Sequence, residues 1–205
     1  MMRIILLVNL VFLFFLLGCK KPKDEPQPCG NCPDPDVISG TYAPQAYEFE
    51  LPDFMPRPLV PEDNPMTIEG VELGRMLFFD PILSIDSTLS CAGCHHPELA
   101  FSDGQAVSKG VLGIAGTRSS MALVNLAFNA RGFFWDGRVN TLEEQALIPI
   151  EDHIEMADTW ENVETKLRRH NDYPALFRGA FGIERKSELT RDLAVKAIAQ
   201  FERTH

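Results

Sequence analysis

The pattern of hydrophobic and polar positions divides this 205-residue chain into three parts. Residues 4–17 are apolar except for Asn9, and residues 19–62 are rich in proline, acidic and short polar residues without a sustained period. Within 63–205, apolar residues recur every three or four positions in several stretches, which is the period of an amphipathic helix. We therefore expect one folded domain at 63–205 behind a disordered, proline-rich linker. The linker should be ordered only at the aromatic residues that touch the domain, namely Tyr42, Tyr47 and Phe49.

The periodic stretches predict four helices and one short helical segment. The first helix begins near Asn64-Pro65, with Thr67 as an alternative N-cap, and runs to Asp80-Pro81. The sequence Thr-Leu-Glu-Glu at 141–144 is a capping box, and its helix must end by Pro149. The other predictions are a short helix at 119–125, a helix at 159–169, and a last helix capped by Thr190 with the apolar stripe Leu193, Ala194, Ala197, Ile198 and Phe201.

The pattern of hydrophobic positions also predicts the fold class. No stretch alternates convincingly with period two, so we expect an all-α domain with long loops. Residues 101–118 contain four glycines, too many for a regular element. A structureless connection of that length favours a function such as covering a cofactor.

The most informative motif is Cys91-Ala92-Gly93-Cys94-His95. This spacing is typical of c-type haem attachment, in which two thiols add to the porphyrin vinyl groups and the adjacent imidazole ligates the iron. The alternatives are a disulfide beside a surface histidine, or half of a zinc site. A zinc site would need a second ligand pair, and none follows at a usual spacing.

The N-terminal pattern predicts export. A short basic start precedes the apolar run, which is shorter than the roughly 20 residues that span a bilayer. Leu16-Leu17-Gly18-Cys19 resembles the lipobox of bacterial lipoproteins. We therefore expect a signal peptide at 1–18 and a diacylated Cys19 that anchors a periplasmic protein to a bacterial membrane. A retained membrane helix is the alternative.

Two further cysteines, Cys29 and Cys32, lie in the linker. In an oxidising compartment this pair is expected to form a local disulfide. Thioredoxin-like redox catalysis would need a preceding strand and a following helix, and the surrounding prolines disfavour both.

The net charge of the chain limits the kinds of molecule that we expect it to bind. With 29 acidic and 19 basic residues, the formal net charge is −10. This charge argues against binding nucleic acid or gripping anionic lipid electrostatically. It would attract a small basic redox partner, although an ordinary soluble acidic surface explains it as well.

The order of several motifs resembles the bacterial dihaem cytochrome c peroxidase family, which includes the dihaem enzyme that matures methylamine dehydrogenase. The resemblance runs from about residue 65 to the end and covers the N-terminal haem domain of that family. The motifs are Leu77-Phe78-Phe79-Asp80-Pro81, the haem motif, Phe101-Ser102-Asp103-Gly104, Phe133-Phe134-Trp135-Asp136-Gly137-Arg138, Leu142-Glu143-Glu144-Gln145-Ala146 and Glu155-Met156.

The resemblance implies a cytochrome c-like fold and a role for each matching residue. Cys91 and Cys94 would attach haem c, and His95 would be the proximal ligand of its iron. Glu155 would be the distal carboxylate, Gln145 its polar neighbour, and Trp135 would lie between two haems. The implied reaction is reduction of hydrogen peroxide with electrons from a small donor such as a cytochrome c or cupredoxin, in a protein that can be a homodimer.

The chemistry of Glu155 agrees with that role. Breaking the O–O bond requires a base that takes one proton and returns it to the departing oxygen. A carboxyl group whose pKa is raised by burial can do this at neutral pH. Spacing alone would favour a surface charge for Glu155 and a core aromatic for Trp135.

Three departures from the family pattern affect the interpretation. Residues 97–152 contain no histidine, so the chain resembles members whose iron keeps an open position, and His153 is too close to Glu155 to match the missing ligand. The family binds calcium between its domains through an asparagine carbonyl, and the nearest position here is Ser119. The second haem domain does not follow before His205, and we expect truncation.

Two other functions remain open from the sequence. The chain could be a single-haem electron carrier with Met156 or Met121 as the sixth iron ligand. It could also be a maturation-type dihaem oxidase that acts on a protein.

Overall fold

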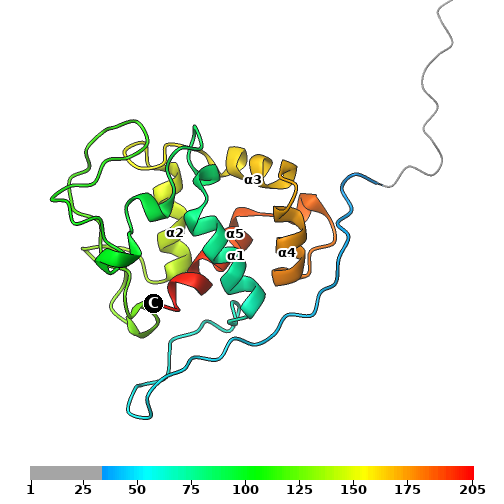
Figure 1. Ribbon diagram of the computed structural model, residues 1–205, viewed down its shortest axis with the longest axis horizontal. Helices are drawn as coiled ribbons and strands as arrows, with labels where there is room; N and C mark the ends of the chain where they lie inside the picture. Colours follow the sequence, from blue (N-terminus) through cyan, green and yellow to red (C-terminus); the bar gives the residue numbers. More distant parts are fainter. Residues whose placement is uncertain (1–33) are drawn as a thin grey trace, which may run out of the picture. The chain divides into compact units, whose positions relative to one another are not determined.

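A computed structural model of the protein describes residues 34–205, which form helices and loops without a named strand in that range. Its α-helices are α1 (Ile68–Phe79), α2 (Leu142–Glu151), α3 (Trp160–Arg169), α4 (Tyr173–Phe181) and α5 (Arg191–Glu202) (Figure 1). Its single-turn 3₁₀ helices are η1 (Pro81–Leu83), η2 (Cys91–Gly93), η3 (Pro97–Leu99), η4 (Leu126–Phe128) and η5 (Lys186–Glu188). The prediction of an all-α domain with long loops is confirmed.

Several predicted features lie outside the described residues. They are the signal peptide, the lipidation site Cys19, the Cys29–Cys32 pair and the first part of the linker. Within 34–205, no helix combines the length and the apolar character needed to cross a membrane.

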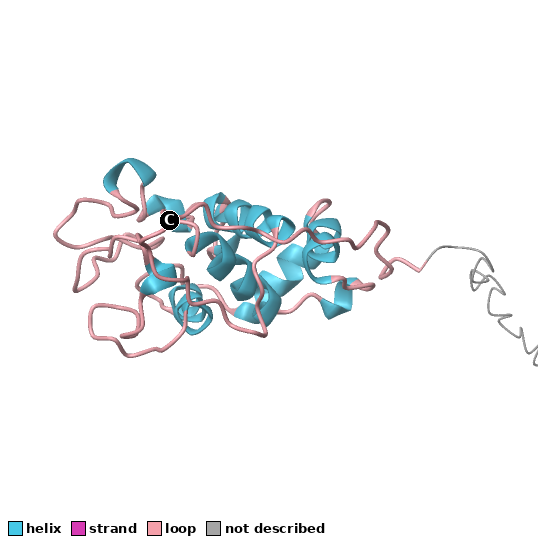
Figure 2. Cartoon of the chain, turned by 90° about the horizontal axis from the view of Figure 1, so that it is seen from below, coloured by secondary structure: helices cyan, strands magenta, loops and turns pink. Residues whose placement is uncertain are grey.

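The core is built around the contact between α1 and α5, with α2 packed on α5 and α4 packed on α1. The two helices approach closely because α1 carries Gly74 at the crossing, where a Cβ atom would overlap the backbone carbonyl of Ala197. The long connection between α1 and α2 lies to one side of these helices (Figures 1 and 2). The packed helices therefore support the long connection, which lies against one side of them.

The first helix does not begin near Asn64-Pro65 as predicted, but after the alternative cap, Thr67. α1 begins after Thr67, whose Oγ1 accepts a hydrogen bond from the Gly70 backbone N–H at 3.0 Å. Asn64, the other candidate, is instead buried and joins the segment before α1 to α5, because its side chain accepts a hydrogen bond from Gln200 Nε2 at 2.8 Å. Helices α3 and α5 begin directly after Thr159 and Thr190, as predicted.

The predicted helix at 119–125 is wrong, since these residues form no helix and Asn125 has a left-handed backbone with a φ of 58°. Ser120 explains the difference, because its groups bond to the haem-motif region rather than to its own backbone turn. Its Oγ donates to the Cys94 carbonyl at 2.6 Å and accepts from the Asp103 N–H at 3.1 Å. Serine competes with helical hydrogen bonding in this way when a distant partner is available.

The prediction that the capping-box helix ends by Pro149 is also wrong, because α2 continues to Glu151. Proline removes only its own N–H from the helical ladder. The Asp152 N–H still donates to the Ile148 carbonyl at 3.1 Å and closes the helix. Pro149 therefore lies in the last turn of α2, where its side chain lines a cavity.

Helix α4 was not predicted from the sequence. Its signals are proline at the second helical position, Pro174, and Gly182 just past its end with a φ of +74°. Its first residue, Tyr173, is fully buried, and its hydroxyl donates to Asp80 Oδ2 at 2.7 Å. α4 therefore holds the end of α1.

Residues 34–62 contain no helix and run along the domain, so that 34–205 form one compact unit. Tyr42 and Tyr47 touch the domain as expected, at Gly182 and at the Met66 carbonyl. A further attachment lies around Ile38, which is buried and donates its N–H to the Glu184 carbonyl at 2.9 Å. Arg185 forms ion pairs with Asp34 and Asp36 beside it.

Candidate functional site

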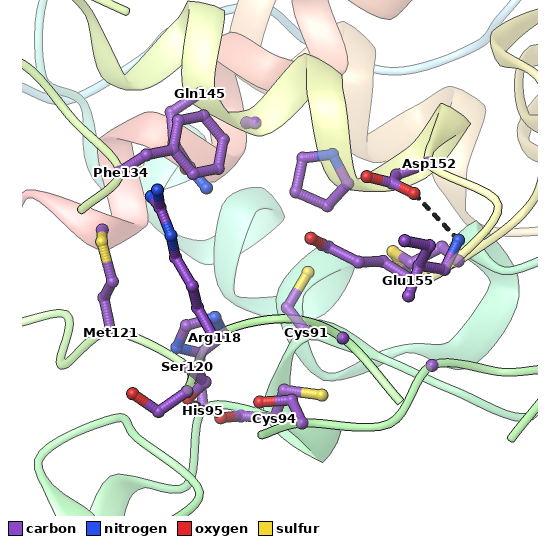
Figure 3. A pocket seen from close by; sticks show the side chains of 18 of the residues that line it. Cys91, Cys94, His95, Arg118, Ser120, Met121, Phe134, Gln145, Asp152 and Glu155 are labelled. Atoms are coloured by element: carbon purple, nitrogen blue, oxygen red, sulfur yellow. Dashed lines mark hydrogen bonds between the residues drawn. The ribbon is translucent and has the colours of Figure 1, made fainter. Parts of the chain in front are cut away.

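The loops and helices enclose a cavity of about 470 Å³. Figure 3 shows Cys91, Cys94 and His95 along one side of it, Gln145 along the opposite side, and Glu155 pointing into the space between them. A cavity of this volume is within the usual range for cofactors and small ligands. The structure therefore brings five of the six predicted site residues of the domain together, and Trp135 lines the edge of the same cavity.

His95 is prepared to ligate a metal. Its Nδ1 atom lies 2.7 Å from the carbonyl oxygen of Phe101, which can only accept a hydrogen bond. Nδ1 therefore carries the proton, and Nε2 keeps its lone pair. Burial lowers the pKa of His95 and favours the neutral imidazole that binds metal. The carbonyl reaches His95 because Ala100 and Phe101 both adopt left-handed backbone conformations, with φ of 55° and 56°.

Cys91 and Cys94 are free thiols that line the cavity on η2 and just after it. The N–H groups of Cys94 and His95 both donate to the Cys91 carbonyl, at 3.1 and 3.0 Å, which holds the motif in one tight turn. Burial, with a smaller contribution from Glu202, raises the pKa of Cys91 to about 12. A zinc ligand would have to be a thiolate, and 34–205 hold no cluster of three or more histidine, cysteine or acidic side chains placed for a metal.

Glu155 lies in the turn that follows α2. Burial raises the pKa of its carboxyl group, Asp152 adds to this effect, and Arg138 opposes it. The backbone carbonyl of Glu155 accepts a hydrogen bond from the Val111 N–H at 2.8 Å. The predicted loop at 101–118 is therefore hydrogen-bonded to the turn that carries Glu155. Part of that loop also lines the cavity. The Glu155 side chain is exposed, but it lines the cavity, where its carboxyl group is partly desolvated.

Gln145 projects from α2 and is only 9 % exposed. Its Oε1 atom is buried without a hydrogen-bond partner among the described residues. Buried amide oxygens are almost always bonded, so an unpartnered one in a cavity wall indicates a site for a ligand or water.

Trp135 is 61 % exposed at the cavity edge, so the core-aromatic alternative is wrong. Its indole N–H donates to the Ser119 carbonyl at 2.9 Å, which fixes the ring at the surface. The same carbonyl is the position that the family pattern assigns to calcium.

The two methionines considered as sixth ligands both line the cavity. Met156 is also packed in the main hydrophobic core. His153, in contrast, is exposed and is not part of the cavity wall.

Sequence reasoning gave no role to several charged residues of the cavity wall, and three of them are Arg118, Arg138 and Glu202. Arg118 and Arg138 both form ion pairs with Asp136, at 3.1 and 3.2 Å. The third, Glu202, lies at the end of α5. A helical pattern could have found Glu202, because it continues the row of Ala194 and Ile198 at a spacing of four residues.

These residues fit a covalently attached haem. Two free thiols and a neutral histidine lie on one wall, and the unpartnered Gln145 Oε1 lies on the opposite wall. The chemistry of this donor set matches the two thioether bonds and one axial ligand of haem c.

Comparison with known proteins also indicates a haem protein. The family model described as di-haem cytochrome c peroxidase matches residues 68–205. The methylamine utilization protein MauG of Methylorubrum extorquens is 40% identical over 156 residues, which are 76% of this chain and 42% of that protein. Cytochrome c551 peroxidase of Nitrosomonas europaea is 38% identical over 141 residues, which are 69% of this chain and 41% of that protein.

A solved structure also resembles this one. The crystal structure of a MauG-like protein associated with microbial copper homeostasis has a TM-score of 0.71 and 35% sequence identity. The match covers 78% of this chain and 47% of that one, so the chain spans less than half the length of these relatives. With the matched family model, these similarities show that the chain belongs to the di-haem cytochrome c peroxidase family.

Proposed function

We propose that this chain reduces hydrogen peroxide to water at a c-type haem bound to Cys91 and Cys94 and ligated by His95. The electrons come from a reduced cytochrome c or cupredoxin through a second haem. The observation that carries the proposal is the position of Glu155: its carboxyl group points into the cavity that Cys91, Cys94 and His95 line, and partial desolvation there raises its pKa.

The haem iron supplies the redox chemistry of O–O cleavage, and the residues of this chain move the protons. The reaction consumes one hydrogen peroxide, two electrons and two protons and yields two water molecules. With haem bound, Glu155 would take a proton from one oxygen of peroxide and return it to the other, which departs as water. Gln145 offers an unpartnered amide oxygen that can orient peroxide by accepting a hydrogen bond.

Trp135 is the proposed point of electron entry. Its exposed ring at the cavity edge supports this role, because a second haem domain could cover it there. Its bond to Ser119 would hold the ring in one orientation during transfer.

The proposal includes the location of the protein. The apolar run at 4–17 and the lipobox ending at Cys19 support export, acylation and anchoring at the periplasmic face of a bacterial membrane. Haem c attachment is compatible with such a compartment.

A maturation-type oxidase that acts on a protein is the second candidate. The 40% identity to a protein named MauG supports it, as does the lack of histidine at 97–152. Both candidates use the same cavity and differ in the molecule that supplies electrons. The test mixes peroxide and reduced cytochrome c with the protein that includes both haem domains. Oxidation of the cytochrome would favour the peroxidase.

The decisive experiment compares Glu155→Gln with Glu151→Gln, a matched change at an exposed position at the end of α2. The rate of the Soret-band change on mixing with peroxide should fall by roughly 10²–10⁴ for Glu155→Gln, the usual scale for general acid–base catalysis. Glu151→Gln should react like the wild type. A haem spectrum that is insensitive to peroxide and to Glu155→Gln, but changed by Met121→Ala or Met156→Ala, would establish the electron carrier instead.

A further inference from the structure

Glu202 is a buried carboxyl group in the wall of the cavity. It is 4 % exposed, and its Oε2 atom has no hydrogen-bond partner among the described residues. It is the last residue of α5 and lines the same cavity as Cys91. Glu155 performs the proposed proton transfer to peroxide, so Glu202 has no role in that reaction.

The neighbouring arginine does not neutralise Glu202 directly. Successive helical residues point about 100° apart, so residues 202 and 203 face different neighbours. The Nη2 atom of Arg203 donates to both carboxylate oxygens of Glu143 on α2, at 2.8 and 2.9 Å. Glu202 therefore faces the cavity while its adjacent cation is engaged by another carboxylate.

We propose that Glu202 takes up one proton when the haem beside it is reduced by one electron, and releases that proton when the haem is oxidised. This inference rests on the part of the proposed function that places a c-type haem on Cys91 and Cys94. The balanced step joins ferric haem, the Glu202 carboxylate, one electron and one proton, and it yields ferrous haem and the Glu202 carboxylic acid. The electron comes from a one-electron donor such as a reduced cytochrome.

The electrostatics of the cavity explain the coupling. Reduction adds one negative charge to the haem, and a buried carboxylate nearby then becomes more costly because charges interact strongly where water is excluded. Burial already raises the pKa of Glu202 to about 8, with Arg203 opposing and Glu143 adding to the effect. Cys91 on η2 also senses Glu202, whose charge raises the pKa of the thiol. Glu155 lies in the same cavity, so the two carboxyl groups must be separated by experiment.

The test is the midpoint potential of the haem, measured spectroelectrochemically between pH 6 and pH 10. The sample is the full chain, produced in a bacterium that attaches c-type haem. If one proton is taken up per electron, the equilibrium constant for haem reduction changes tenfold per pH unit. The midpoint potential then falls with a slope approaching about 59 mV per pH unit. The wild type should show such a slope around pH 8. Glu202→Gln should flatten it while leaving the haem attached.

Two control variants identify the group. Asp192→Asn changes an exposed carboxyl group on the same helix and should keep the wild-type slope. Glu155→Gln should also keep it, although its reaction with peroxide is slowed. A slope that survives in Glu202→Gln, or disappears in Glu155→Gln, overturns the assignment to Glu202.

A measurement on the unaltered chain covers the case in which Glu202→Gln does not fold. The infrared difference between reduced and oxidised protein near pH 8 should contain a protonated-carboxyl band that gains intensity on reduction. A spectrum without that band would also overturn the proposal. These outcomes are distinct from failure of the proposed function. A protein without covalent haem has no haem potential to measure, whereas a protein that does not react with peroxide still has a measurable haem potential.

Discussion

Gly110 lies against the backbone carbonyl of Ile154 so closely that a Cβ atom at residue 110 would overlap it. The carbonyl of Glu155 is also within overlap distance of that Cβ position. The loop at 101–118 and the turn that carries the proposed catalytic carboxyl group are therefore packed backbone to backbone.

Gly110→Ala should displace the Glu155 turn. Because the obstacle is backbone rather than a flexible side chain, one segment must move, and the carboxyl group moves with it. We expect the reaction with peroxide to slow by at least about tenfold, since misplacement by roughly 1 Å can cost 10²-fold. Gly179→Ala in α4 is the control, because its added Cβ meets open space. Equal peroxide rates in the two variants would contradict the role of this contact.

Replacing Cys91 and Cys94 with serine should release the haem. Thioether bonds survive denaturation and acid–acetone extraction, so the wild type should keep its haem through both treatments. The double variant should lose it to the solvent phase. Haem-free wild-type protein from a host with working cytochrome c maturation would argue against the attachment site.

Trp135→Phe should leave haem attachment and the first reaction with peroxide unchanged, because the ring is largely exposed at the cavity edge and phenylalanine keeps an aromatic side chain there. It should reduce sustained turnover with reduced cytochrome c when a second haem domain is supplied, since the indole is the proposed route for electrons. Turnover is measured by oxidation of the donor, with the single-turnover peroxide reaction as the internal reference. Efficient turnover by this chain alone, unaffected by Trp135→Phe, would show that one haem is sufficient.

Lys166→Met should destabilise the domain by about 3 kcal/mol, because it leaves a buried carboxylate without its partner. Lys166 Nζ lies 2.7 Å from Asp158 Oδ2 and also donates to the Ser84 carbonyl. Arg169→Met, at an exposed position on the same helix, is the control. The measurement is urea unfolding at neutral pH.

The same pair predicts a pH dependence. Burial alone would raise the pKa of Asp158, but hydrogen bonds from Lys166, Asn162 and the Thr159 N–H outweigh it, and the pKa lies below the ordinary 3.8. A lowered pKa means that the pair contributes its stability above pH 3.8 and loses it as the pH falls through the lowered value. The stability difference between wild type and Lys166→Met should therefore shrink below pH 3.8. A difference that stays constant in acid would contradict the assignment to Asp158.

Local sequence determined much of this protein. The spacing within 91–95 places two thiols and an imidazole on one turn, which the hydrogen bonds of the motif's own backbone close. The threonine caps at 67, 141 and 159 fix where three helices begin, because each hydroxyl accepts a hydrogen bond from an N–H three residues later. These features are local, and the sequence predicted them, although Thr67 was only the alternative to a start near Asn64-Pro65.

Tertiary structure decided the features that depend on distant partners. Residues 119–125 are not helical because Ser120 bonds to the haem-motif region and to Asp103, which no local pattern reveals. Glu202 looks like an ordinary helix-end charge until the fold turns it toward the cavity and turns Arg203 toward Glu143. Whether a carboxyl group is a solvated surface charge or a buried proton carrier depends on what surrounds it, and only packing of the whole chain supplies those surroundings.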